Sequence, residues 1–131
     1  MDEPYLPLRT ICDSGLTVIT MYVPGREGLI AGEIAINVGA AHAASIDKRL
    51  VGIPHFLEHW LMFGASRNFG PREVNKRLPK QFALQNNAST GPAGTRFFRS
   101  GNGHVVPADL FWNAFAMVVD GTFFPKFDQE T

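Results

Sequence analysis

The sequence predicts a mixed α+β domain in which helices pack on one face of a mostly antiparallel sheet. Short runs of β-branched and aromatic residues alternate along the chain with segments that place apolar residues at helical spacing. No internal repeat or low-complexity tract interrupts this order. At 131 residues, the chain has the length of one domain with a core of its own.

The first part of the chain predicts two strands. Residues 16–23 are β-branched and aromatic, and they follow a turn at residues 13–15. Residues 31–38 are the second candidate, and the short connection at residues 24–28 predicts that the two strands pair antiparallel. The small-residue segment 39–45 is expected to be a loop that leads to a helix.

Two helices are predicted in the middle of the chain. Residues 54–63 suit a helix because proline is favoured in a first turn and Gly64 is a natural stop. Residues 71–78 leave few apolar positions, and they predict a short exposed helix that ends before Pro79.

The last part of the chain predicts a hairpin and a longer helix. Residues 82–89 and 95–100 are strand-like and flank a turn of glycine, proline and alanine at residues 91–94. Residues 107–120 place apolar side chains at helical spacing, and Gly121 is expected to end this helix.

Composition excludes several classes of protein. The chain is 45% hydrophobic and 18% charged, which is incompatible with disorder. Lys and Arg number 12, as do Asp and Glu, so net charge favours neither nucleic acid nor an acidic membrane. No apolar run approaches the roughly 18 residues of a membrane span, so none is predicted. A single cysteine, Cys12, and the lack of a signal-peptide pattern favour a cytoplasmic location, with the periplasm or an organelle as alternatives.

Residues 55–59, with the sequence His-Phe-Leu-Glu-His, form the candidate site. On a helix, His55 and His59 lie one turn apart on the same face, and Glu58 joins them there. Two imidazoles can bind one zinc ion, and a free carboxylate beside them can take a proton from a water that attacks a peptide carbonyl. The neighbouring residues are mostly apolar, so all three side chains are expected to be buried, at a cost that a metal would remove. This spacing is the signature of the inverted zinc peptidases.

Several segments, in the same order along the chain, resemble the pitrilysin or insulinase-type metallopeptidases, a family that includes the mitochondrial processing peptidases. Residues 13–18 and 34–39 are similar to the family's first two strands, and residues 52–64 are similar to its metal helix. Residues 87–90 and 95–98 are similar to the strand pair that follows this helix. Residues 124–127 are similar to the family's Pro-x-Phe segment. The resemblance implies the fold of that family's metal-binding domain and a zinc-dependent endopeptidase that hydrolyses extended peptides.

The resemblance also implies roles for individual residues. His55 and His59 would be the zinc ligands, and Glu58 would be the general base. Asn87 and Ala88 would form the sheet edge to which a substrate peptide adds as an extra strand. Because such pairing is made through the backbone, the site would accept many peptide sequences.

A catalytic zinc needs a third protein ligand, and in the family it is a glutamate whose position falls beyond Thr131. Asp120, Asp128 and Glu130 do not match that position. The resemblance therefore implies that residues 1–131 are the N-terminal part of one peptidase domain, truncated before the third ligand. The second domain would be in the same polypeptide or in a partner subunit. The fragment alone is expected to be inactive and to bind zinc weakly or not at all.

Two other functions are weighed against the peptidase. One is a non-catalytic scaffold or core subunit of the same fold, although such subunits usually lose part of the metal motif. The other is a nucleic-acid module, suggested by seven basic residues between the metal motif and the last helix: Arg67, Arg72, Lys76, Arg77, Lys80, Arg96 and Arg99. A solvated face or a patch for acidic peptides is the preferred interpretation, because no known nucleic-acid module accompanies them. His42 and His104 are expected to be ordinary surface residues.

The phenylalanines are unevenly distributed, since all eleven lie between Phe56 and Phe127. A second half with many phenylalanines and few charges predicts surface that something else covers. Phe123, Phe124 and Phe127 are expected to be covered by chain outside the 131 residues, and the fragment alone is expected to self-associate.

Overall fold

A computed structural model describes residues 6–26, 28–71, 85–102 and 106–127 of the chain. The elements, in order, are β1 (Leu8–Ile11), β2 (Thr17–Thr20), β3 (Leu29–Ile36), α1 (Ala40–Ile46), the 3-10 helix η1 (Lys48–Leu50), α2 (Ile53–Phe63), β4 (Gln85–Thr90), β5 (Thr95–Asn102) and α5 (Ala108–Phe123). The short helix predicted at residues 71–78 lies outside the described residues after Pro71, as does the start of the strand predicted at residues 82–89.

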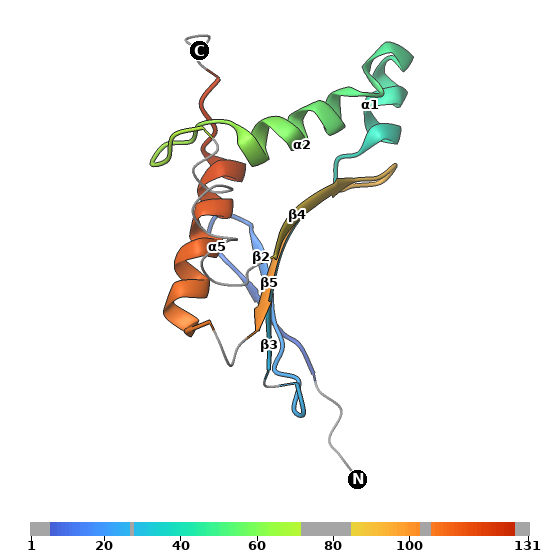
Figure 1. Ribbon diagram of the computed structural model, residues 1–131. Helices are drawn as coiled ribbons and strands as arrows, with labels where there is room; N and C mark the ends of the chain where they lie inside the picture. The colour runs from blue at the N-terminus through green and yellow to red at the C-terminus, as the bar shows by residue number, and fades with distance from the viewer. Residues whose placement is uncertain (1–5, 27, 72–84, 103–105, 128–131) are drawn as a thin grey trace.

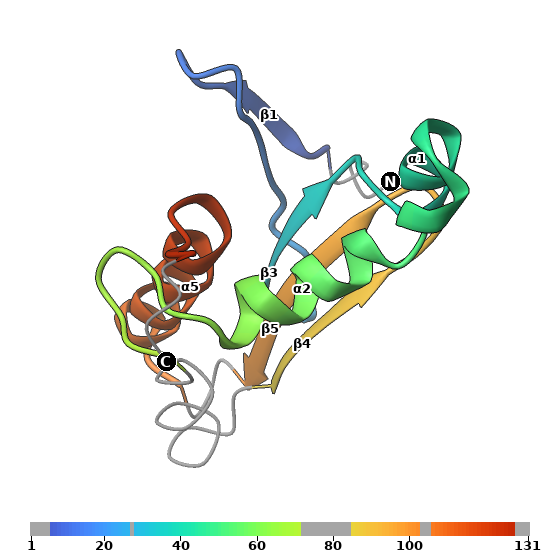
Figure 2. The same ribbon diagram turned by 90° about the horizontal axis from the view of Figure 1, so that it is seen from above.

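The described strands form two antiparallel sheets. One has three strands in the order β3-β5-β4, and the other is the pair β1-β2. Helix α2 lies over β4 and β5, and α5 packs against β3 and β5 (Figures 1 and 2). The predicted α+β class, with helices on a mostly antiparallel sheet, is confirmed.

The core lies between the three-stranded sheet and these two helices. Ile34 of β3, Phe97 of β5 and Ala88 of β4 are opposite one another in register, so their side chains share one face of the sheet. Val118 of α5 and Leu61 of α2 pack against this group. Both helices therefore cover the same face, and the core fixes the position of α2 relative to β4.

The predicted pairing of residues 16–23 with residues 31–38 is wrong. Strand β2 is shorter than predicted and pairs with β1, a strand that the sequence pattern did not predict. Strand β3 pairs with β5, with Ile34 opposite Phe97. The physical reason is that β5 places a buried phenylalanine beside Ile34, whereas every residue of β2 is exposed.

The predicted loop at residues 39–45 is also wrong, because residues 40–46 form α1. Alanine is the strongest helix former, and the turn between β4 and β5 supplies acceptors for the helix N-terminus. The Ala40 N–H donates to the Gly91 carbonyl at 3.0 Å, and the Ala41 N–H donates to the Pro92 carbonyl at 2.9 Å. A sequence rich in small residues thus becomes a helix because a distant turn caps it.

Helix α5 runs past its expected stop at Gly121 and ends at Phe123. A Cβ on Gly121 would lie 3.0 Å from the Leu61 carbonyl oxygen of α2. The glycine therefore serves the close approach of two helices rather than helix termination.

Much apolar surface of the described residues is exposed. The β1-β2 hairpin extends away from the three-stranded sheet (Figure 2), and all of its strand residues are exposed. Phe123, Phe124 and Phe127 at the other end keep 45%, 43% and 59% of their surface exposed. Within the described ranges, none of the helices is long and apolar enough to cross a membrane.

Candidate metal centre

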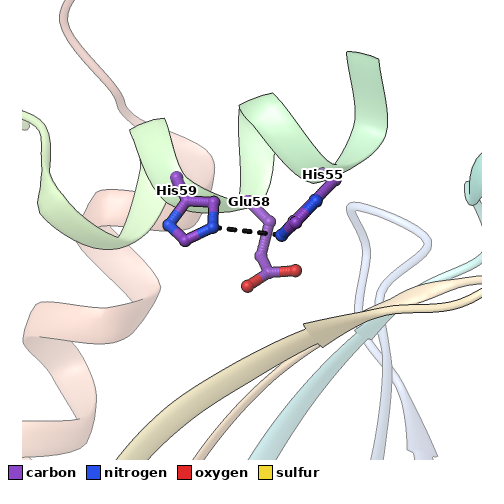
Figure 3. Close-up of side chains that lie close together, drawn as sticks. All are labelled: His55, Glu58 and His59. Carbon is purple, nitrogen blue, oxygen red and sulfur yellow. Dashed lines mark hydrogen bonds between the residues drawn. The ribbon is translucent and has the colours of Figure 1, made fainter. Parts of the chain in front are cut away.

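The candidate metal ligands lie on α2, whose bounds confirm the predicted helix. The helix has Pro54 in its first turn, and it ends where the Gly64 N–H donates to the Trp60 carbonyl at 2.7 Å. Figure 3 shows His55, Glu58 and His59 projecting from one side of α2 toward the strands. The spacing of the three residues in the sequence therefore places them on one helix face, as predicted.

The three side chains form a compact group. Nε2 of His55 and Nε2 of His59 lie 3.0 Å apart, and the candidate ligand atoms of the group all lie within 4.8 Å of one another. Glu58 is buried with 6% of its surface exposed, whereas both histidines are exposed. The expectation that all three are buried is therefore wrong for the histidines.

The two imidazoles fit a zinc ion. Zinc binds histidine nitrogen at about 2.0–2.1 Å, so two nitrogens at a tetrahedral angle lie about 3.3 Å apart. The observed separation of 3.0 Å needs only a small opening of the two side chains to reach that value. Imidazole nitrogen is a common ligand of zinc and of other transition metals, and the group could hold a metal ion.

Glu58 is held by a residue that the sequence analysis did not single out for this role. The Thr90 hydroxyl, at the end of β4, donates a hydrogen bond to Glu58 Oε2 at 2.6 Å. Thr90 lies 32 residues further along the chain, and no local pattern around either residue indicates the contact. Only the packing of α2 on β4 reveals it.

Asn87 and Ala88 lie on β4, the strand over which α2 packs. Within the described residues, β4 pairs only with β5, so its other side is a sheet edge. The Ala88 side chain packs into the core, while Asn87 is exposed and its Oδ1 accepts a hydrogen bond from the Ala88 N–H at 2.9 Å. Whether a substrate peptide adds at this edge stays a prediction.

Asp120 is engaged away from the candidate metal ligands. Its carboxylate accepts hydrogen bonds from the Asn68 backbone at 3.0 Å and from the Asn68 side chain at 2.9 Å. Among the described residues, no other histidine, cysteine or acid joins the group of His55, Glu58 and His59. Asp128 and Glu130 lie outside the described residues.

The environment of Asp120 favours its charged form. Burial raises the pKa of the carboxyl, but hydrogen bonds and the nearby charge of Arg67 lower it by more, so the net pKa lies below its usual value. The Ser66 hydroxyl and the two hydrogen bonds from Asn68 lower the pKa together.

The far end of α2 is anchored to the segment after α5. The Trp60 indole N–H donates to the Lys126 carbonyl at 3.2 Å, and the Trp60 ring stacks on Phe127 with centroids 5.9 Å apart. The Lys126 N–H in turn donates to the Ala65 carbonyl at 2.9 Å. These contacts fix the helix that carries both histidines.

Three of the seven basic residues lie in the part of the chain that the structure describes, and they differ in their surroundings. Arg96 lies 3.7 Å from Glu33, and the Arg67 guanidinium lies over the ring of Phe124. Arg99 is fully buried, so the expectation that it lies on a solvated face is wrong. The other four residues of the set lie outside the described part of the chain: Arg72, Lys76, Arg77 and Lys80.

The two remaining histidines are not part of the site as described. His42 accepts a hydrogen bond from the Gly39 N–H at its Nδ1, 3.3 Å away, within α1. His104 lies outside the described residues. His42 is an exposed surface residue, as predicted.

Comparison with known proteins places the fold. No protein-family model and no curated protein matches the sequence. Among solved structures, the chain is similar to a protease from Helicobacter pylori, with a TM-score of 0.77 and 21% sequence identity. The match covers 97% of this chain and 28% of the protease chain. This chain therefore has the fold of a segment that makes up less than a third of that protease.

Proposed function

We propose that this chain is the N-terminal, metal-binding part of a zinc-dependent endopeptidase of the pitrilysin or insulinase type. His55 and His59 are the zinc ligands that it contributes, and Glu58 is the general base. The observation that carries the proposal is the gathering of both imidazoles and the buried carboxylate within 4.8 Å on one helix. The likeness in fold to a protease supports the same class of reaction.

The proposed mechanism assigns a separate task to each side chain. When bound, zinc supplies the Lewis acidity that makes water nucleophilic near neutral pH and polarises a peptide carbonyl. His55 and His59 would hold the ion through their imidazole nitrogens. Glu58 accepts the proton of the attacking water and returns it to the leaving amine. Because the Glu58 side chain is buried and bonded to Thr90 of β4, little bulk water competes for its carboxylate.

The proposed substrate is an extended peptide that adds to the free edge of β4 at Asn87 and Ala88. This strand lies directly below the helix that carries the metal ligands. Backbone pairing along a sheet edge orients a peptide while making few demands on its side chains. The enzyme is therefore expected to cleave peptides of varied sequence.

The third zinc ligand is proposed to be a glutamate outside these 131 residues. A second domain, in the same polypeptide or in a partner subunit, is proposed to close over the peptide. This proposal agrees with the 28% share of the Helicobacter protease chain that the match covers. Residues 1–131 alone are then expected to bind zinc weakly and to hydrolyse no peptide.

The substitution Glu58→Gln in the complete protein tests the proposal. Glutamine keeps the shape of the side chain but cannot accept the proton of the attacking water at neutral pH. Peptide hydrolysis should fall by about 100-fold or more, the usual contribution of a general base. The zinc content should stay at the level of the unchanged protein, because Glu58 is not proposed as a ligand.

Glu33→Gln is the matched control, because Glu33 is an acid on β3, in the sheet that α2 packs against, and its only described ion pair is with Arg96. It should leave peptide hydrolysis and zinc content unchanged. Full activity in Glu58→Gln would remove Glu58 from the role of base. A complete protein that holds no zinc and cleaves no peptide would instead favour the scaffold subunit.

A further inference from the structure

The side chain of Thr90 connects the sheet edge to the candidate base. Its hydroxyl donates to Glu58 Oε2 at 2.6 Å, the only hydrogen bond between side chains of α2 and β4 among those the structure describes. A hydrogen bond from a hydroxyl to a carboxylate is roughly twice as strong as a hydrogen bond between two neutral groups. Glu58 is therefore fixed by the strand as well as by its own helix.

Thr95 is the other polar neighbour of the Thr90 hydroxyl. Thr95 is directly opposite Thr90 in the β4–β5 register, and its hydroxyl donates to the Val38 carbonyl at 2.9 Å. Each threonine has a single hydroxyl proton. The proton of Thr95 is used by Val38, and the proton of Thr90 is used by Glu58. The two hydroxyl oxygens, 3.4 Å apart, therefore make no strong bond with each other.

We propose that Thr90 is a positioning residue for Glu58. By holding Oε2, it sets the plane of the carboxylate, and Oε1 becomes the oxygen that takes the proton of the attacking water. Thr90 itself touches neither histidine in the described contacts. The proposal rests on the proposed function, because it assigns a task to a neighbour of the proposed base.

The proposal makes a specific distinction between the two oxygens of Glu58. An unheld carboxylate on a flexible side chain occupies several orientations, and only some of them would direct an oxygen at the attacking water of the proposed mechanism. Preorganisation of this kind affects the rate of the chemical step more than substrate binding or metal affinity. A purely structural contact between α2 and β4 would instead affect stability and all three properties together.

The test compares Thr90→Val with Thr90→Ser in the complete, zinc-loaded protein. Valine keeps the shape of threonine and lacks the hydroxyl, whereas serine keeps the hydroxyl. Thr90→Val should lower kcat about tenfold while KM and the zinc affinity change by less than about threefold. Thr90→Ser should restore kcat to within about threefold of the unchanged protein.

Thr122→Val is the matched control. The Thr122 hydroxyl is buried and donates to the Val118 carbonyl at 2.8 Å within α5. Its removal costs a hydroxyl hydrogen bond of similar length within α5, in which Glu58 takes no part. This variant should lose thermal stability to a degree similar to Thr90→Val, but its kcat should remain unchanged.

A second measurement does not depend on activity. A crystal structure of zinc-loaded Thr90→Val should show the Glu58 carboxylate rotated or in more than one orientation, whereas Thr90→Ser should show the single orientation of the unchanged protein. A Glu58 carboxylate with unchanged orientation in Thr90→Val, or a kcat within twofold of that of the unchanged protein, would overturn the positioning role. If the unchanged protein hydrolyses no peptide, the proposed function fails, and the orientation of Glu58 still decides the role of Thr90.

Discussion

Nε2 of His55 lies 3.0 Å from Nε2 of His59. Two nitrogen lone pairs at this distance would repel each other. One ring therefore carries a hydrogen on Nε2 and donates a hydrogen bond, and Nε2 of the other ring accepts it. A metal ion needs both lone pairs. Binding therefore requires the donor ring to carry its proton on Nδ1 instead, and the contact between the rings is replaced by two bonds to the metal.

The first prediction concerns this pair. His59→Ala should lower the zinc affinity of the complete protein at least about 100-fold, because one of the few ligand bonds is lost. Competition with a chromophoric chelator measures the affinity. His42→Ala is the control, since His42 lies outside the group. An unchanged zinc affinity in His59→Ala would show that the metal is bound elsewhere.

The second prediction concerns Gly39, which precedes α1. A Cβ on Gly39 would overlap the Gly91 carbonyl oxygen and lie 2.6 Å from the Gly94 nitrogen. These are backbone atoms that cannot rotate away, so Gly39→Ala must separate α1 from the turn between β4 and β5. The cost should be about 1–3 kcal/mol, the range for overpacking. Hydrogen exchange of the Ala40 and Ala41 amides should accelerate, because their acceptors move away.

Gly52→Ala provides the comparison for Gly39→Ala. Gly52 precedes α2 with φ −85°, and a Cβ there would meet nothing within 4 Å. Its substitution should change the stability by no more than about 0.5 kcal/mol. Equal exchange rates at Ala40 and Ala41 in Gly39→Ala and in the unchanged protein would contradict the close approach.

The parts of the fold that the sequence predicted are those determined by neighbours in the chain. Pro54 and Gly64 mark the ends of α2, and the Gly-Pro turn marks the hairpin of β4 and β5. The spacing of His55 and His59 was sufficient to place both on one face. Each of these inferences needs only residues within one or two turns of each other.

The parts that were predicted wrongly depend on distant contacts. The pairing of β3 with β5 brings Ile34 beside Phe97, and nothing near Ile34 in the sequence indicates this partner. Helix α1 depends on carbonyls of the β4–β5 turn, and Gly121 lies inside α5 where that helix closely approaches Leu61 of α2. The hydrogen bond of Thr90 to Glu58 was not predicted for the same reason, because its two residues are distant in the sequence. Tertiary packing decided each of them.

The third prediction concerns the acid dependence of stability. The pKa of folded Asp120 lies below the value of 3.8 expected when the chain is unfolded. Its contribution to stability is therefore present above about pH 4 and is lost as the pH falls through the lower folded pKa. Asp120→Asn should lower the thermal midpoint at pH 7, and this difference should shrink below about pH 4. Calorimetry at several pH values measures it.

Asn68→Ala tests the cause of this effect. The substitution removes the side-chain bond to Asp120 Oδ1 and leaves the backbone bond to Oδ2. The acid dependence should therefore lie between those of the unchanged protein and Asp120→Asn. An equal destabilisation of Asp120→Asn at pH 7 and pH 3 would show that the carboxylate stabilises the fold by its shape and not by its charge.

The fourth prediction concerns Arg99 of β5. The side chain is fully buried, and its guanidinium nitrogens have no hydrogen-bond partner among the described residues. Burial lowers the pKa of Arg99 to about 10, so the group still carries its charge at neutral pH. A buried charge without a partner is destabilising. Arg99→Met keeps the length of the side chain and removes the charge, so it should raise the local free energy of unfolding by about 1–3 kcal/mol.

Arg96→Met is the matched control, because Arg96 lies on the same strand with its side chain 64% exposed. Its change in stability should stay within about 0.5 kcal/mol, as for most surface substitutions. Hydrogen exchange of the β5 amides reports both effects on the same strand. Slower exchange in Arg99→Met alone would establish that the buried charge opposes folding. Faster exchange would show instead that Arg99 pairs with an acid outside the described residues, since loss of a buried ion pair is strongly destabilising.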